Sequence, residues 1–230
     1  MEKNETLELL EEMSGFFNER AEKYDEVHLG HVGGIENKNI IATFLPEHTK
    51  TLIDFGIGTG LELNAIFERF PDVEVTGIDI AANMLEQLKA NYPDKKINLH
   101  CISYLDFDFG INLYDVALSV MTLHHYTHEV KLSLYRKIYN SLRENGVYIE
   151  NDYMLSEHEH ENPQEMEDFY FAEYQRLLNE QNLDTTKEYH YDTPCTVINQ
   201  KKLLLQAGFK KVNEVWRRQG GNAVILVAEK

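Results

Sequence analysis

The chain has few cysteines, few prolines and no long apolar run in its 230 residues. Two cysteines, Cys101 and Cys195, are too few for a disulfide framework, which favours reduced thiols. No stretch approaches the ~20 consecutive apolar residues that cross a bilayer, and the acidic first residues predict no secretory signal. We therefore expect a cytoplasmic protein that does not bind a membrane.

Basic residues are also scarce, because 22 lysines and arginines stand against 39 acids, for a net charge of −17. A nucleic-acid or anionic-membrane partner needs a basic face, and the sequence shows only short basic pairs. This balance disfavours nucleic acid as a partner and favours a neutral or cationic substrate over a polyanion.

The stretch Leu-Ile-Asp-Phe-Gly-Ile-Gly-Thr-Gly at 52–60 is the most informative part of the chain. An apolar strand contains Asp54 near its end, three glycines follow at alternate positions, and a helical pattern starts at Leu61. Because glycine lacks a Cβ atom, the backbone can turn sharply and a ligand can lie against it. A strand, a glycine turn and a helix start together predict a site for an extended polar cofactor.

A second apolar strand, 73–79, ends in Asp79, 19 residues after Gly60. A carboxylate at that place accepts hydrogen bonds from the ribose hydroxyls of a nucleoside, and its alternative role is to cap the next helix. Further strands are predicted at 97–102, 114–120 and 147–152, with helices between them. This alternation predicts a parallel sheet.

Three segments lie outside that alternation. Residues 4–24 predict an amphipathic helix, so 1–37 is interpreted as an N-terminal helical lid. A helix start at 162–165 places a helical cap insertion at 153–195 over the substrate site. The core would then be 38–152 with 196–230, where a helix over 196–207 ends at a left-handed Gly208 and strands at 212–216 and 223–227 form a hairpin.

In this order the motifs resemble those of the class I S-adenosylmethionine-dependent methyltransferases of the small-molecule type. The resemblance rests on 54–60, on 77–79 with the following helix, on 114–125, on 142–146 and on the C-terminal 207–216. It implies an α/β, Rossmann-like, doubly wound sheet of seven mostly parallel strands with an antiparallel C-terminal hairpin. It also implies an enzyme, a monomer or homodimer, that transfers a methyl group from S-adenosyl-L-methionine to a small molecule by direct displacement. Alignment and desolvation are then the main tasks of the protein.

The resemblance assigns cofactor contacts to the glycine turn, to the ends of three strands and to the lid. They are Asp54, Gly56, Gly58, Gly60, Asp79, Ile80, Met84, Ser103, Tyr104, Ser119 and Tyr24. Ser103 stands where the family usually has an acid that binds the adenine amino group.

Candidate catalytic residues follow the fourth strand, where His124 and His125 offer a general base near neutral pH or a structural lining of the pocket. Residues that would face the same sheet edge and form an aromatic box for a substrate or a cation are Asp152, Tyr153, His190, Trp216 and Arg217.

Three alternatives remain open at this stage. His28 with His31, or the run 157–161, would suit a divalent metal, although acidic runs in acidic proteins are ordinarily solvated surface and no metal is expected. A nicotinamide-dependent oxidoreductase has the same glycine turn and an acidic residue that binds the ribose, but its sequence fingerprint requires glycine or alanine at the position of Leu61. A module that binds S-adenosylmethionine without catalysis is the third alternative.

Overall fold

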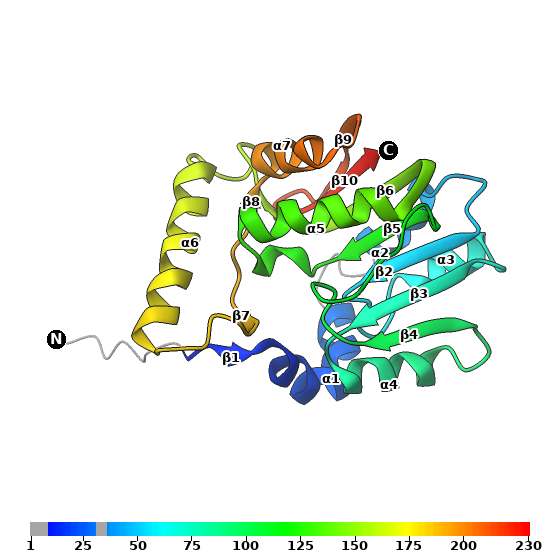
Figure 1. Ribbon diagram of the computed structural model, residues 1–230, viewed down its shortest axis with the longest axis horizontal. Coiled ribbons are helices and arrows are strands. Elements are labelled where there is room, and N and C mark those ends of the chain that lie inside the picture. Colours follow the sequence, from blue (N-terminus) through cyan, green and yellow to red (C-terminus); the bar gives the residue numbers. More distant parts are fainter. Residues whose placement is uncertain (1–8, 31–35) are drawn as a thin grey trace.

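The computed structural model describes residues 9–30 and 36–230 and has a central twisted sheet (Figure 1). Its strands are β2 (Thr51–Phe55), β3 (Glu74–Asp79), β4 (Ile97–Cys101), β5 (Tyr114–Val120), β6 (Leu142–Leu155), β9 (Lys211–Arg217) and β10 (Ala223–Glu229). They lie in the order β4-β3-β2-β5-β6-β10-β9, and a short β8 (Cys195–Thr196) pairs parallel with β6. The first five are mutually parallel and β10 is antiparallel to both neighbours, which confirms the expected seven-stranded sheet with a C-terminal hairpin.

Helices cover both faces of the sheet, as the alternation of buried residues in β5 requires. Val116 and Leu118 join the apolar cluster shared with α2 (Glu36–Ile41), the 3-10 turn η1 (Ala42–Phe44), α3 (Leu63–Arg69) and α4 (Ala82–Asn91). Ala117, between them, joins the cluster shared with α5 (His128–Ser141) and α7 (Val197–Ala207). The sheet is therefore a doubly wound core buried on both sides.

The prediction of a helix over 4–24 is wrong at its start, as far as the described residues show. Glu11–Glu12 form β1, which pairs antiparallel with β7 (Tyr189–His190), so helix α1 begins only at Met13 and runs to Gly30. Backbone pairing with a segment far along the chain replaces the helical periodicity there. Side chains of Asn18 and Asn83 exchange hydrogen bonds with the partner helix at 2.9 and 3.0 Å and hold α1 on α4.

The segment between the fifth and sixth core strands contains one long helix, α6 (Pro163–Glu180), which stands apart from the sheet in Figure 1. It starts where the sequence predicts, although the side chain of Asn162 makes no capping hydrogen bond. Strand β6 continues to Leu155, three residues past its expected end, because β8 and the start of β10 pair with this extension. Helix α7 ends at Gly208 with a positive φ of 120°, as expected. Within the part of the chain that is described, no helix is both long and apolar enough to cross a membrane.

The sheet order places the glycine turn at a defined point. The chain leaves β2 toward β3 and β4 on one side, and returns with β5 and β6 on the other. Ligands of open α/β sheets bind at the carboxyl ends of the strands at such a switch point. The turn at 56–60 and the 3-10 turn η2 (Leu123–His125) both lie at this edge.

Candidate active site

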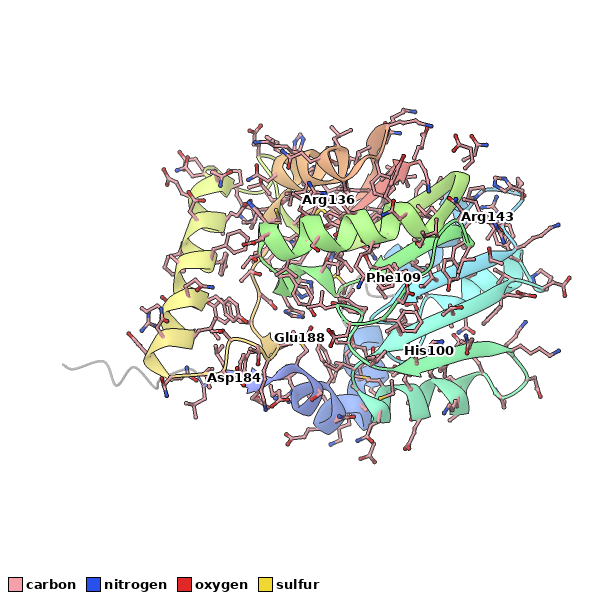
Figure 2. The ribbon with its side chains drawn as sticks, viewed as in Figure 1. His100, Phe109, Arg136, Arg143, Asp184 and Glu188 are labelled. Atoms are coloured by element: carbon pink, nitrogen blue, oxygen red, sulfur yellow. The ribbon has the colours of Figure 1, made fainter. Side chains whose placement is uncertain are left out.

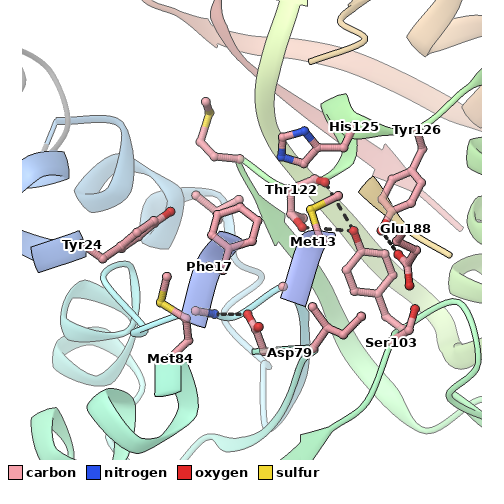
Figure 3. A pocket seen from close by; sticks show the side chains of 16 residues that line it. Met13, Phe17, Tyr24, Asp79, Met84, Ser103, Thr122, His125, Tyr126 and Glu188 are labelled. Atoms are coloured by element: carbon pink, nitrogen blue, oxygen red, sulfur yellow. Dashed lines mark hydrogen bonds between the residues drawn. The ribbon is translucent and has the colours of Figure 1, made fainter. Parts of the chain in front are cut away.

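A cavity of about 530 Å³, its mouth included, lies at the carboxyl edge of β2, β3 and β5 and is covered by α1 (Figure 3). Of the residues assigned to the cofactor, the structure brings eight to its wall: Tyr24, Gly56, Gly58, Asp79, Ile80, Met84, Ser103 and Tyr104. Asp54, Gly60 and Ser119 lie just outside the wall. The hydroxyl of Ser119 is buried and lies 2.6 Å from the hydroxyl of Tyr148.

The glycine turn is fixed by backbone hydrogen bonds and by close packing. The amide nitrogens of Gly56 and Ile57 donate to the carbonyl of Ile78 at 2.8 and 3.1 Å, which anchors the turn to β3. Gly56 has φ +67°, and a Cβ atom there would lie 2.3 Å from the hydroxyl oxygen of Thr122. Only glycine therefore fits this position, and the backbone forms an open cradle for a ligand.

Asp79 joins the glycine turn to the start of α4. Its carboxylate accepts the amide of Gly58 at 2.8 Å and the amide of Ala81 at 2.8 Å. Burial raises the pKa of Asp79 to about 6, and the hydrogen bonds from Ala81 and Gly58 oppose that rise. The carboxylate thus supports the helix start and still has lone pairs that face the cavity for ribose hydroxyls.

The raised pKa of Asp79 predicts a pH dependence of cofactor binding. Affinity for S-adenosylhomocysteine should fall as the pH drops through about 6, because the protonated carboxyl is a poorer acceptor for ribose hydroxyls. For the free protein the sign is opposite: Asp79 favours the folded state below its ordinary value of 3.8, and this contribution is lost as the pH rises through about 6. Calorimetric titration with S-adenosylhomocysteine at pH values on both sides of about 6 measures the fall in affinity. Asp79→Asn should bind more weakly without this pH dependence, and an equal slope in both proteins would contradict the assignment.

Asp54 lies at the base of the turn and is almost fully buried. No N–H group among the described residues donates to either oxygen of its carboxylate. Burial, and next the charge of the Glu62 carboxyl and a hydrogen bond with it, raise the pKa of Asp54 well above its ordinary value. A buried pair of carboxyl groups beside a glycine cradle fits the ammonium group of an amino-acid moiety, so the residues present suit S-adenosylmethionine.

Ser103 and Tyr104 form the part of the wall after β4. The hydroxyl of Ser103 accepts the amide of Leu105 at 3.1 Å, and the hydroxyl of Tyr104 lies 3.1 Å from that of Thr122. Ile80 and Met84 line the same cavity and supply apolar surface for a base. The structure thus brings the expected adenine contacts together, with serine in place of the acid.

The two histidines of η2 have different surroundings. His125 lines the cavity, and its Nδ1 donates to the carbonyl of Tyr191 at 3.1 Å, which leaves the Nε2 lone pair available. Burial, and next the neighbouring His124, lower the pKa of His125 well below its ordinary value, so its ring is neutral. His124 lies outside the cavity wall with Nδ1 2.5 Å from Asp152, and this carboxylate raises the pKa of His124 in spite of burial.

The residues expected to hold the substrate do not line the cavity. The carboxylate of Asp152 accepts hydrogen bonds from the amides of Leu123 and Tyr153 and pairs with His124. His190 stacks on Phe16 with ring centroids 3.5 Å apart. The remaining candidates lie elsewhere. Tyr153 is half-buried with its ring 6.1 Å from that of His124, and Trp216, a residue of β9, packs against an apolar core cluster. Arg217 pairs with Glu214 beside a separate hollow near α6. A direct contact of these residues with a substrate stays a prediction.

The cavity also has wall residues that were not among the predicted site residues. Met13 and Phe17 come from α1, Thr122 and Tyr126 flank η2, and Glu188 comes from the segment before β7. Thr122 and Tyr126 lie beside the histidine pair, so the strand end indicated them indirectly. Met13 and Glu188 reach the site only through the pairing of β1 with β7.

Groups of possible metal ligands differ from those expected. His31 and the side chain of His28 lie outside the described residues, and the run 157–161 forms no such group. In the described ranges the groups are His124 with His125 and Asp192, and His128 with Glu167 and Cys195. In the second group, the carboxylate of Glu167 already accepts hydrogen bonds from the amide of Thr196 and from the side chain of Asn199. The expectation that no metal is used stays a prediction.

The fold and the cavity together define an α/β enzyme with a site for an adenosyl cofactor at a glycine turn. Residues 52–146 match the family described as a methyltransferase domain. This match and the similarities that follow support a class I S-adenosylmethionine-dependent methyltransferase with S-adenosyl-L-methionine as its cofactor.

Individual similarities agree with this conclusion. A carboxy-S-adenosyl-L-methionine synthase of Nautilia profundicola is 24% identical over 186 residues, or 78% of this chain and 77% of that protein. A candidate O-methyltransferase of Nostoc punctiforme has a TM-score of 0.71 at 21% identity, covering 96% of this chain and 62% of that one. The human N-acetylserotonin methyltransferase has a TM-score of 0.66 at 16% identity, covering 94% and 56%. The chain thus spans less than two thirds of both solved chains, and at these identities their structures show the fold alone.

Proposed function

We propose that this methyltransferase acts on a small molecule held in the outer half of the cavity. S-adenosylmethionine supplies an activated methyl group, and the protein supplies binding, orientation and exclusion of water. The single observation that carries the proposal is the division of one covered cavity into two ends. Tyr24, Met84 and Asp79 lie at one end, and His125, Tyr126 and Glu188 lie at the other (Figure 3).

The cover of the cavity supports a small acceptor. Helix α1 covers it with Met13 and Phe17, and the carboxylate of Asp25 accepts the hydroxyl of Thr59 at 2.5 Å beside the glycine turn. A covered pocket admits a metabolite more readily than a nucleic-acid strand, and the net charge of −17 supports the same choice.

We further propose that His125 takes the proton that the acceptor loses, and that His124 positions it. A neutral imidazole whose Nδ1 is held by a carbonyl presents Nε2 as the acceptor. His124 lies against His125 with ring centroids 4.0 Å apart and is itself held by Asp152. Asp152 therefore orients the pair without touching the acceptor.

Replacing His125 with alanine should lower kcat by roughly 100-fold, which is the usual contribution of a general base. Affinity for S-adenosylhomocysteine should remain, because Tyr24, Met84 and Asp79 lie at the other end of the cavity. Methyl-labelled S-adenosylmethionine and a library of small acceptors measure the transfer, and His158→Ala, an exposed histidine of the cap, is the control. Tight cofactor binding with no transfer to any acceptor would instead support a non-catalytic binding module.

The similarity to carboxy-S-adenosyl-L-methionine synthases raises a second chemistry, transfer of a carboxylate-bearing group. A carboxylated ligand needs a cationic partner, and no lysine or arginine lines the cavity among the described residues. Methyl transfer therefore remains the function that the site supports best. We also propose that the enzyme works in the reducing cytoplasm, since Cys101 and Cys195 are both unpaired.

A further inference from the structure

Glu188 is a carboxylate at the acceptor end of the cavity that the roles described above do not use. It lies between α6 and β7, in the segment that brings the cap back to the sheet. Figure 2 shows it nearer the sheet edge than Asp184, which lies in the segment after α6. Its backbone carbonyl accepts the amide of Met13 at 2.8 Å, which fixes this segment to the start of α1. Backbone pairing with α1 thus sets the position of the Glu188 side chain.

No cation neutralises Glu188 within the described part of the chain. Its side chain accepts the hydroxyl of Tyr126, and it forms no ion pair with a lysine, arginine or histidine there. The nearest histidine of the cavity wall, His125, is neutral because burial lowers its pKa. Glu188 in turn contributes to raising the pKa of Tyr104, Tyr126 and Tyr174, after the larger effect of burial. The carboxylate therefore lies among phenol groups with its charge uncompensated.

Aromatic rings complete the same end of the cavity. Tyr126, and Tyr104 that was also assigned to the cofactor, line the cavity together with Glu188, and their rings meet edge to face at 5.8 Å. A carboxylate beside aromatic faces is a site that attracts organic cations, through charge and through cation–π contact. The only other carboxylate of the wall, Asp79, lies at the cofactor end.

We propose that this end of the cavity is a subsite for an amine, and that the enzyme methylates nitrogen. This inference rests on the methyl transfer proposed above and names the class of acceptor. Glu188 holds the ammonium form of the acceptor, and aromatic side chains surround its carbon frame. Recognition therefore depends on a positive charge, which the acidic chain also attracts from a distance.

The charge movement of the reaction favours nitrogen over oxygen at this place. The acceptor first gives up a proton, to water or to His125. The nitrogen lone pair then forms the bond to the methyl carbon as the bond from carbon to sulfur breaks, and sulfur keeps the electron pair. Positive charge thereby moves from sulfur to nitrogen, toward Glu188, which stabilises the product ammonium. A hydroxyl acceptor would develop negative charge beside this carboxylate, and a carboxylic acid would bring a second negative charge.

Three probes with the same carbon frame test the proposal: 2-phenylethylamine, 2-phenylethanol and phenylacetate. We expect labelled methyl to enter the amine in preference to the other two. Glu188→Gln keeps an oxygen for the hydroxyl of Tyr126 and removes only the charge, so it should lower kcat/KM for the amine by roughly 10- to 100-fold. Glu161→Gln, an exposed glutamate of the cap that removes the same charge, should not change kcat/KM.

The outcomes separate the two proposals when the titration of S-adenosylhomocysteine is measured on the same proteins. Cofactor binding with transfer only to the alcohol or the acid overturns the amine subsite and leaves methyl transfer intact. Transfer to the amine that is equal in wild type and Glu188→Gln also overturns it. Cofactor binding with no transfer to these probes or to a wider set of amines, alcohols and acids overturns both proposals.

Discussion

Replacing Asp79 with alanine is expected to weaken binding of S-adenosylhomocysteine by roughly 100-fold, because the carboxylate that we propose as the acceptor for the two ribose hydroxyls is lost. The same carboxylate accepts the amides of Gly58 and Ala81, so the variant also leaves two amides at the turn without their acceptor. Calorimetric titration gives the affinity, and thermal unfolding of the free protein gives the structural part of the effect.

A matched control separates ribose binding from loss of charge. Asp94→Ala removes one exposed carboxylate shortly after α4 and should leave the affinity unchanged. If Asp79→Ala stays folded and binds S-adenosylhomocysteine as tightly as the wild type, the cofactor lies elsewhere and the assignment of the cavity is wrong.

Replacing Gly56 with alanine is expected to lower methyl transfer by roughly 100-fold, because the cradle beneath the cofactor moves. The new Cβ atom would lie 2.3 Å from the hydroxyl oxygen of Thr122, and φ of +67° disfavours any residue with a Cβ atom. We expect a loss of about 2 kcal/mol in the free energy of unfolding as well. Initial rates at saturating acceptor and chemical unfolding measure the two effects.

Gly220→Ala is the control for this variant, since Gly220 has a similar φ of +65° and open space around its Cα atom. It should lose stability through backbone strain alone and retain transfer. A second variant, Gly56→Ala with Thr122→Gly, removes the collision and should recover part of the activity. Equal transfer in Gly56→Ala and wild type would contradict the close approach of Thr122 to the turn.

The sequence located the residues that line one end of the cavity because that end is built from local motifs. The glycine turn and Asp79 each follow a strand directly, and parallel neighbouring strands bring their carboxyl ends to one edge. Residues that directly follow neighbouring strands in the sequence therefore lie close together in the fold. The same reasoning located Tyr104 and Met84, which lie within a few residues of the strand ends.

The acceptor end was not predictable in the same way, since its residues come from segments far apart in the sequence. Glu188 reaches the cavity because β7 pairs with β1, and two-residue strands leave no periodic signal. Conversely, Asp152 lies near the carboxyl end of core strand β6, where a ligand-binding acid would stand. Its carboxylate is occupied by two amides and His124, a commitment that only the folded structure shows.

The pairing of β1 with β7 also couples the two ends of the cavity mechanically. Met13 begins the helix that covers the adenosyl end, and its amide is bound to the carbonyl of Glu188 at the opposite end. With the two ends used as proposed, lifting α1 to release the spent cofactor would pull on the segment that carries Glu188. Exit of one ligand would then loosen the enclosure of the other.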